Sequence, residues 1–288
     1  MCIKIVYVEK IKDIYKKEGV CILQRKIQGN LIIIGGAEDK KNGKDILKEV
    51  CKKIDKEKEE LLIATVASEL PEELGEEYTN IFKNLGVKNV KILNINNRKD
   101  THYEGNVNLI KNASLIFFTG GDQLRITSLL GGTPLYRALE RAYKEGCIFV
   151  GTSAGASVMS DTMIVSGLDD ESPRKCTLKM APGLSLIRGV IIDQHFAQRG
   201  RIGRLLTGIA ENPQWLGIGI DEDTAIIVNT EGQFKVIGSG AVYIIDGTEI
   251  SGTNVSEQYP DEILSIFDVK LHVLKNRDKF DLNYRRPI

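Results

Sequence analysis

The first half of the chain alternates short apolar segments with amphipathic ones, and this alternation constrains the fold more than any other feature. The apolar runs, each expected to be a buried strand, lie near residues 30–34, 61–66, 90–93, 114–118 and 147–150. The segments with helical spacing are 44–56, 71–85, 106–112 and 134–144. Strands that are apolar on both faces and alternate with helices indicate a parallel sheet covered on both sides. We therefore predict an α/β fold, a three-layer sandwich with a mainly parallel central sheet.

The last third of the chain changes to short strands and turns with one helix. Expected strands lie at 190–193, 217–220, 225–228, 234–237, 241–245 and 270–274, and the helix lies at 201–209. We interpret the acidic sequence Asp221-Glu222-Asp223 as the turn that closes a hairpin, in preference to a substrate contact. This β-rich third is expected to extend the sheet or to add a hairpin layer. Residues 29–288 are therefore predicted to form a single domain, which carries the catalytic motifs described below.

Residues 1–28 are expected to be an N-terminal extension. Two short apolar runs in them allow an edge strand. Charged residues such as Lys4, Glu9 and Asp13 interrupt these runs, so the segment lacks the continuous apolar stretch of a signal peptide. No apolar run approaches the roughly 20 residues that span a bilayer. We therefore expect a cytoplasmic protein.

Composition argues against several classes of partner. The chain has 39 Lys and Arg against 39 Asp and Glu, so its formal net charge is zero and gives no electrostatic basis for binding nucleic acid or an anionic membrane. Its five cysteines are scattered without a Cys-x-x-Cys pair, which indicates neither a disulfide framework nor a zinc site. The double glycines at 35–36 and 120–121 lack the full phosphate-loop patterns. No metal or cofactor is expected.

A motif that carries chemistry follows the strand at 147–150. The sequence Gly-Thr-Ser-Ala-Gly at 151–155 has the Gly-x-Ser-x-Gly pattern of a nucleophile elbow, a sharp strand-to-helix turn that exposes one hydroxyl. The free N–H groups at the start of the following helix favour a developing oxyanion. The alternative is an ordinary strand–loop–helix connection. The rest of the chain favours the nucleophile, which would be Ser153.

A serine nucleophile needs a base and an acid. Among three histidines, His195 directly follows the strand at 190–193 and is the expected base, because carboxyl ends of parallel strands converge. Asp169, Asp170 and Glu171 lie between Ser153 and His195, in the order Ser, acid, His of α/β-hydrolase sites. Spacing does not choose among the three.

Two backbone N–H groups are the expected oxyanion donors. One belongs to Ala154, the residue after the nucleophile. The other belongs to Gly121, in the glycine pair after the strand at 114–118, because glycine permits a close approach of the backbone.

Three separated segments resemble the cyanophycinase family of serine peptidases, to which peptidase E is related. They are residues 118–123, residues 151–156, and residues 193–196 with the arginines that follow. The resemblance runs from about Gly29 to the end of the chain. It implies a flavodoxin-like or class I glutamine-amidotransferase-like fold, often as a homodimer, and a triad in which Glu171 is the acid. The substrate-lining residues that it implies are Gln123, Asp193, Gln194, Arg199, Arg201 and Arg204.

The resemblance also implies a substrate. It would be cyanophycin, multi-L-arginyl-poly-L-aspartate, hydrolysed by an exopeptidase through an acyl-enzyme to β-aspartyl-arginine dipeptides. Arginine side chains suit the carboxylates of such a polymer, and acidic side chains suit its guanidinium groups. The alternatives are a peptidase E-like aspartyl dipeptidase and a non-catalytic binding protein on the same fold. A cysteine amidotransferase is disfavoured because the elbow carries serine.

Overall fold

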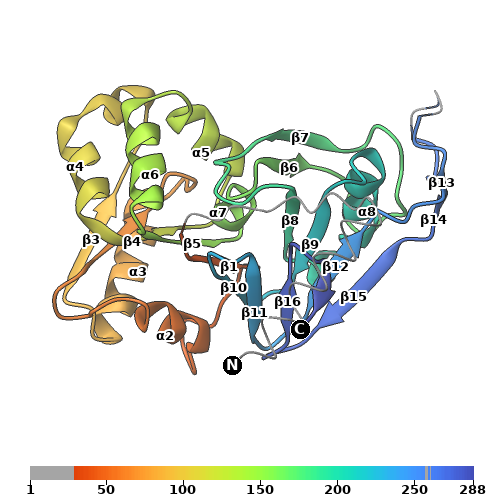
Figure 1. Ribbon diagram of the computed structural model, residues 1–288. Coiled ribbons are helices and arrows are strands. Elements are labelled where there is room, and N and C mark those ends of the chain that lie inside the picture. Colours follow the sequence, from red (N-terminus) through yellow and green to blue (C-terminus); the bar gives the residue numbers. More distant parts are fainter. Residues whose placement is uncertain (1–28, 257–258, 260) are drawn as a thin grey trace, which may run out of the picture.

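The computed structural model describes residues 29–256, 259 and 261–288 (Figure 1). Residues 1–28, where an extension with an edge strand is predicted, lie outside the described residues. The strands are β1 (Leu31–Ile34), β2 (Glu60–Ala64), β3 (Asn89–Leu93), β4 (Ala113–Phe118), β5 (Ile148–Thr152), β6 (Thr162–Ser166), β7 (Lys179–Pro182), β8 (Val190–Gln194), β9 (Leu216–Ile220), β10 (Thr224–Val228), β11 (Gln233–Gly238), β12 (Val242–Asp246), β13 (Gly252–Thr253), β14 (Ile266–Phe267), β15 (Lys270–Leu274), β16 (Lys279–Asp281) and β17 (Arg286–Pro287). The helices are α2 (Asp45–Cys51), α3 (Pro71–Asn84), α4 (Glu104–Asn112), α5 (Gln123–Leu130), α6 (Pro134–Lys144), α7 (Ala154–Ser157) and α8 (Ile202–Glu211), with 3₁₀ turns η1 (Arg98–His102) and η2 (Ala197–Arg199).

The larger sheet has nine strands in the order β17-β16-β11-β10-β1-β5-β4-β2-β3. The five strands β1, β5, β4, β2 and β3 run parallel, and β10, β11, β16 and β17 extend the sheet beyond β1 with antiparallel pairs. The predicted mainly parallel sheet is therefore confirmed for the first half of the chain. The C-terminal third adds the antiparallel edge.

Helices cover both faces of the parallel strands. Successive strand residues point to opposite sides of the sheet, and here the apolar side chains on both sides are buried. In β4, Phe117 packs against Tyr78 and Phe82 of α3. The next residue, Phe118, stacks on Phe149 of β5 on the opposite face, where α4, α5 and α6 lie. Figure 1 shows α2 and α3 on one side of these strands and α4 to α6 on the other. The three-layer arrangement is confirmed for this half.

A second sheet of four strands has the order β15-β12-β9-β8. Strands β8 and β9 are parallel, with Gln194 opposite Ile220, and the other pairs are antiparallel. Leu205 and Ile209 of α8 pack on its outer face. The expected hairpin across residues 221–223 is wrong: β9 belongs to this sheet and β10 to the larger one, so the turn passes from one sheet to the other.

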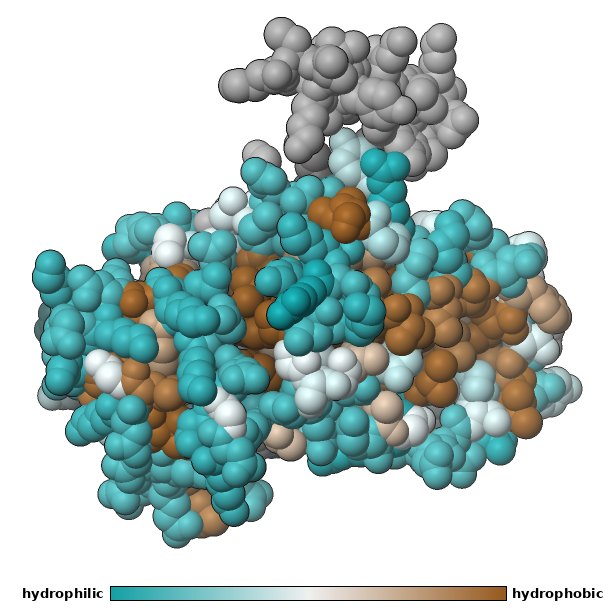
Figure 2. All heavy atoms as spheres, turned by 90° about the horizontal axis from the view of Figure 1, so that it is seen from below, coloured by the Kyte–Doolittle hydropathy of each residue, from teal (hydrophilic) through white to brown (hydrophobic). Residues whose placement is uncertain are grey.

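The surface seen from below is mostly hydrophilic over the parallel half (Figure 2). Hydrophobic surface gathers on the side of the C-terminal strands. Large exposed apolar residues there include Phe267 of β14 and Leu271 and Val273 of β15. No helix in the described part of the chain is long and apolar enough to cross a membrane.

Candidate active site

Ser153 stands at a strained turn between β5 and α7. Its backbone has φ 54° and ψ −112°, a conformation that residues other than glycine rarely adopt. Glycines allow the close packing around it: a Cβ atom on Gly151 would lie 2.1 Å from the carbonyl oxygen of Gly155. The geometry is that of a nucleophile elbow, as the sequence predicts.

A chain of two hydrogen bonds runs from the serine through His195 to a carboxylate. Ser153 Oγ lies 3.0 Å from His195 Nε2, and His195 Nδ1 lies 2.6 Å from Glu222 Oε1. A carboxylate at Nδ1 fixes the tautomer in which Nδ1 carries the proton and Nε2 is free to accept one. The three side chains therefore have the arrangement of a serine–histidine–acid triad.

The turn between β9 and β10 holds Glu222 toward the histidine through its two neighbours. Asp221 is buried and accepts hydrogen bonds from the backbone N–H groups of Ala197 and Ala241, at 2.9 and 3.0 Å. Asp223 has φ 46°, and its backbone N–H donates to the carbonyl of Gly36 at 2.9 Å. The flanking aspartates fix the turn, and the central glutamate is left to face the imidazole.

The expected position of the acid needs correction. Glu171 is half exposed, and the cation nearest to its carboxylate is Arg174, at 3.8 Å. Asp169 accepts from Arg201 and Arg204 instead of the imidazole, and Asp170 has φ 55° in the same exposed loop. The imidazole turns toward the end of β9 because β8 and β9 are parallel neighbours, so that the residues after them meet at one edge.

The glycine pair after β4 approaches the elbow. A Cβ atom on Gly120 would lie 3.5 Å from Ser153 Cβ. Gly121 has φ 139° and packs against Ala67, where a Cβ atom would lie 2.1 Å from the carbonyl oxygen. The backbone N–H of Ala154, at the start of α7, has no acceptor among the described residues. The assignment of Gly121 and Ala154 as oxyanion donors stays a prediction.

Comparisons with known proteins show the family to which the chain belongs. The model of "Peptidase family S51" matches residues 31–237. This chain belongs to peptidase family S51. Cyanophycinase of Geminocystis herdmanii is 36% identical over 267 residues, which cover 92% of this chain and 98% of the relative. Cyanophycinase of a Nostoc species is 39% identical over 259 residues, which cover 90% and 87%. The crystal structure of a peptidase from an acI-B1 actinobacterium is 23% identical with a TM-score of 0.58, covers 87% of this chain and 99% of its own, and shows a similar fold.

Burial lowers the pKa of His195 in this S51 peptidase from its ordinary value near 6.5. The hydrogen bond that Glu222 accepts from the imidazole opposes that shift, and the positive charge of Arg199 adds to it. The lowered pKa favours the neutral imidazole, which is the state that a general base needs.

The activity is expected to be lost in acid with a midpoint below pH 6.5. A lowered pKa keeps the base neutral to lower pH, so activity is present above that pKa and falls as the pH drops through it. Arg199→Gln removes one charge that lowers the pKa and should move the midpoint upward. A profile of kcat/KM against pH measures both, and a midpoint at or above 6.5, or a downward shift in the variant, contradicts the expectation.

Four of the six predicted substrate residues form a buried ionic network in this S51 chain. Arg204 donates to Asp193 through Nε at 2.7 Å and also through its terminal nitrogen, and donates to Asp169 at 3.0 Å. Arg201 donates to Asp169 at 2.9 Å and to the carbonyl of Gln194 at 2.6 Å. Both guanidinium groups are therefore engaged by the protein and fix the end of β8 directly before His195. Direct contact of these residues with substrate stays a prediction.

The two remaining residues lie apart from that network. Gln123 begins α5 and donates to the carbonyl of Ile164 at 2.8 Å, which ties this helix to β6. Arg199 ends η2, is exposed, and has no carboxylate partner among the described residues. Arg199 is therefore the member of the predicted set whose guanidinium is available to a carboxylate of the substrate.

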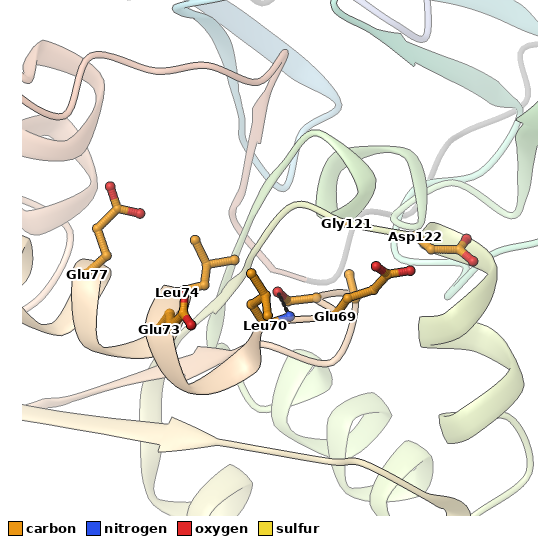
Figure 3. Close-up of a pocket in the computed structure, with 9 residues that line it drawn as sticks. Glu69, Leu70, Glu73, Leu74, Glu77, Gly121 and Asp122 are labelled. Carbon is orange, nitrogen blue, oxygen red and sulfur yellow. Dashed lines mark hydrogen bonds between the residues drawn. The ribbon is translucent and has the colours of Figure 1, made fainter.

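A cavity of about 790 Å³ adjoins the glycine pair. Its walls are α3, the loop before α3, and the segment after β4, and its lining residues are Ala67, Ser68, Glu69, Leu70, Glu73, Leu74, Glu77, Gly121 and Asp122. Figure 3 shows glutamates spaced along α3 and the preceding loop, with Gly121 and Asp122 at the opposite end. Glu77 pairs with Lys40 at 2.9 Å, but no described lysine or arginine pairs with Glu69 or Glu73. The cavity thus combines leucine side chains with two glutamates, Glu69 and Glu73, that form no ion pair with another described residue.

Among the described residues, no group of three or more His, Cys, Asp or Glu side chains lies close enough together to hold a metal ion. The described cysteines, Cys51, Cys147 and Cys176, are unpaired thiols. Cys147 is buried and burial raises its pKa to about 12, so it is a core residue.

Proposed function

We propose that this S51 peptidase hydrolyses cyanophycin to β-aspartyl-arginine dipeptides through an acyl-enzyme on Ser153. The observation that carries the proposal is the hydrogen-bonded chain from Ser153 through His195 to Glu222 at a strained elbow. Relatives at 36 to 39% identity over about nine-tenths of the chain, named cyanophycinase, support the substrate. In this proposal Glu222 is the acid of the triad.

Acylation begins when Ser153 Oγ attacks the scissile aspartyl carbonyl carbon and its proton passes to His195 Nε2. Glu222 accepts the hydrogen bond from Nδ1–H and stabilises the imidazolium. The oxyanion that forms accepts hydrogen bonds from the backbone N–H groups of Ala154 and Gly121. His195 then gives its proton to the leaving amine, the C–N bond breaks, and an ester to Ser153 remains.

Deacylation repeats these roles with water in place of the serine hydroxyl. His195 takes a proton from water, and the hydroxide adds to the ester carbonyl. When the tetrahedral intermediate collapses, the proton returns to Ser153 Oγ and the acid product leaves. Free enzyme is regenerated, and one water molecule is consumed for each bond cleaved.

The test is digestion of insoluble cyanophycin by the purified protein, with the products identified by mass. We expect β-aspartyl-arginine as the main soluble product. The same protein is offered α-linked Asp-x dipeptides, the substrate class of a peptidase E-like enzyme. Faster turnover of these dipeptides, with cyanophycin left intact, contradicts the proposal.

The acidic cavity supports a substrate that carries guanidinium groups, because the aliphatic stem of arginine suits the leucines and its head suits the carboxylates. We expect the double variant Glu69→Gln/Glu73→Gln to raise KM for cyanophycin by about 2- to 10-fold, the effect of exposed ion pairs, with kcat little changed. Added salt should shrink the difference. Glu76→Gln, an exposed glutamate of α3 that does not line the cavity, is the matched control. An unchanged KM in the double variant excludes this role.

We also propose the homodimer that the family resemblance implies and the cytoplasmic location that the sequence predicts. The exposed apolar side chains of β14 and β15 support the homodimer, since a contiguous apolar surface is typical of a contact between proteins. Light scattering on the full chain measures the mass in solution.

A further inference from the structure

The loop after β1, residues 35–39, contacts the segments of all three triad residues. The carbonyl of Ile34, the last residue of β1, accepts from the backbone N–H of Ser153 at 3.1 Å. The carbonyl of Gly35 accepts from His195 at 2.8 Å, and that of Gly36 accepts from Asp223 at 2.9 Å. Three successive carbonyls therefore bind the nucleophile, the base and the residue next to the acid.

Each of these three partners is held in a strained backbone conformation. Ser153, His195 and Asp223 have φ of 54°, 48° and 46°. Non-glycine residues persist in this region only where their surroundings over-determine it. The carbonyls from Ile34 to Gly36 supply part of that restraint, so the loop after β1 bears directly on the alignment of the triad.

Glu38 adds a side-chain restraint to the same loop. It is 4% exposed, and both carboxylate oxygens accept hydrogen bonds. Oε2 accepts from Thr152 Oγ1 at 2.6 Å, and Oε1 accepts from the hydroxyl of Tyr78. Burial raises the pKa of Tyr78 well above its ordinary value, so its hydroxyl remains a donor. Glu38 therefore bridges Thr152 of β5 and Tyr78 of α3 through its two carboxylate oxygens.

Thr152 is the last residue of β5 and directly precedes the nucleophile. Its side chain is buried, and its only hydrogen-bond acceptor among the described residues is Glu38. The position of the elbow is therefore coupled through one short hydrogen bond to the loop that also binds the histidine and the acid turn.

We propose that Glu38 is a positioning residue for the reaction: by accepting from Thr152 it locks the elbow onto the loop that aligns His195 and Glu222. The inference rests on the proposed serine mechanism and not on the identity of the substrate. Glu38 touches neither substrate nor the reacting atoms in this role. Its effect is on the rate at which Ser153 reacts.

The test compares two variants that each free one oxygen of Glu38. Thr152→Val keeps the shape of the side chain but removes the hydroxyl next to the nucleophile, whereas Tyr78→Phe removes the donor on the other side. We expect Thr152→Val to lower the rate of Ser153 labelling by a fluorophosphonate, and kcat, by about 10- to 100-fold with KM within about twofold, because small displacements of reacting groups have effects of that size. Tyr78→Phe should stay within about threefold of wild type in both rates. Thr152→Ser, which keeps the hydroxyl, should restore them.

A purely structural role predicts a different result. Both Thr152→Val and Tyr78→Phe would then lower the melting temperature while the labelling rate of the folded protein stayed at the wild-type value, and this outcome overturns the proposal. If Thr152→Val does not fold, Glu38→Gln takes its place, and a wild-type labelling rate in that variant overturns the proposal equally. Labelling depends on the serine and its alignment with the base, and it does not require the polymer substrate. A failure of cyanophycin hydrolysis with normal labelling therefore refutes the proposed substrate and leaves this result intact.

Discussion

Ser153→Ala is expected to abolish cyanophycin hydrolysis, with kcat lowered roughly 10⁴- to 10⁶-fold, the range seen when a serine nucleophile is removed. The reason is that no other group lies within hydrogen-bond distance of His195 Nε2 in the described part of the chain. Alanine has the same backbone preferences as serine at φ 54°, so the melting temperature should change little. Turnover is measured as dipeptide release from the insoluble polymer.

The matched control is Ser157→Ala, which removes the hydroxyl of a buried serine at the end of the same short helix. It should retain activity within about threefold. Labelling by a fluorophosphonate gives an independent readout, since Ser153→Ala should lose it and Ser157→Ala should keep it. Substantial turnover by Ser153→Ala would mean that the reaction uses another nucleophile.

Glu222→Gln is expected to lower kcat by about 10³- to 10⁴-fold, because an amide at this position no longer fixes the reactive tautomer of His195 or stabilises its charged form. The carboxylate also raises the pKa of the histidine, so the acid limb of the residual activity should move to lower pH. The measurement is kcat and its pH profile on the same substrate.

Glu171→Gln is the discriminating comparison. Glu171 is half exposed and its nearest cation is 3.8 Å away, so the variant should remain within about threefold of wild type. A larger loss in Glu171→Gln than in Glu222→Gln would support Glu171, the acid that the family resemblance implies, and would refute Glu222 as the acid of the triad.

The strands and helices of the parallel half could be predicted because each is indicated by the residues within its own segment. Runs such as Leu31–Ile34 are apolar on both faces, and α3 begins at Pro71, which is favoured at the first helical position. The second sheet could not be predicted, because which strands pair is decided by contacts between distant residues. The sequence does not predict the hairpin of β6 and β7, because the apolar run in β6 is only three residues long and β7 has no buried residue.

That Ser153 and His195 lie within hydrogen-bond distance could be predicted, because each follows a recognisable strand. The carboxylate that contacts the imidazole was not predicted. The order Ser, acid, His restricted the candidates to residues before His195, and the family resemblance then implied Glu171. Here Glu222 follows His195 by 27 residues. The sequence does show that Asp221-Glu222-Asp223 directly follows a buried strand. This position places Glu222 near His195 only if β8 and β9 are parallel neighbours, and the sequence does not reveal that pairing.

The turn that carries Glu222 is also where the chain crosses from the smaller sheet to the larger. Ser153 extends from the larger sheet, and His195 extends from the smaller one. Ser153, His195 and Glu222 therefore meet at the boundary between the two sheets, and their arrangement depends on the packing of one sheet against the other. Local opening of the smaller sheet would abolish catalysis while the parallel half stayed folded. Loss of activity would therefore report that opening.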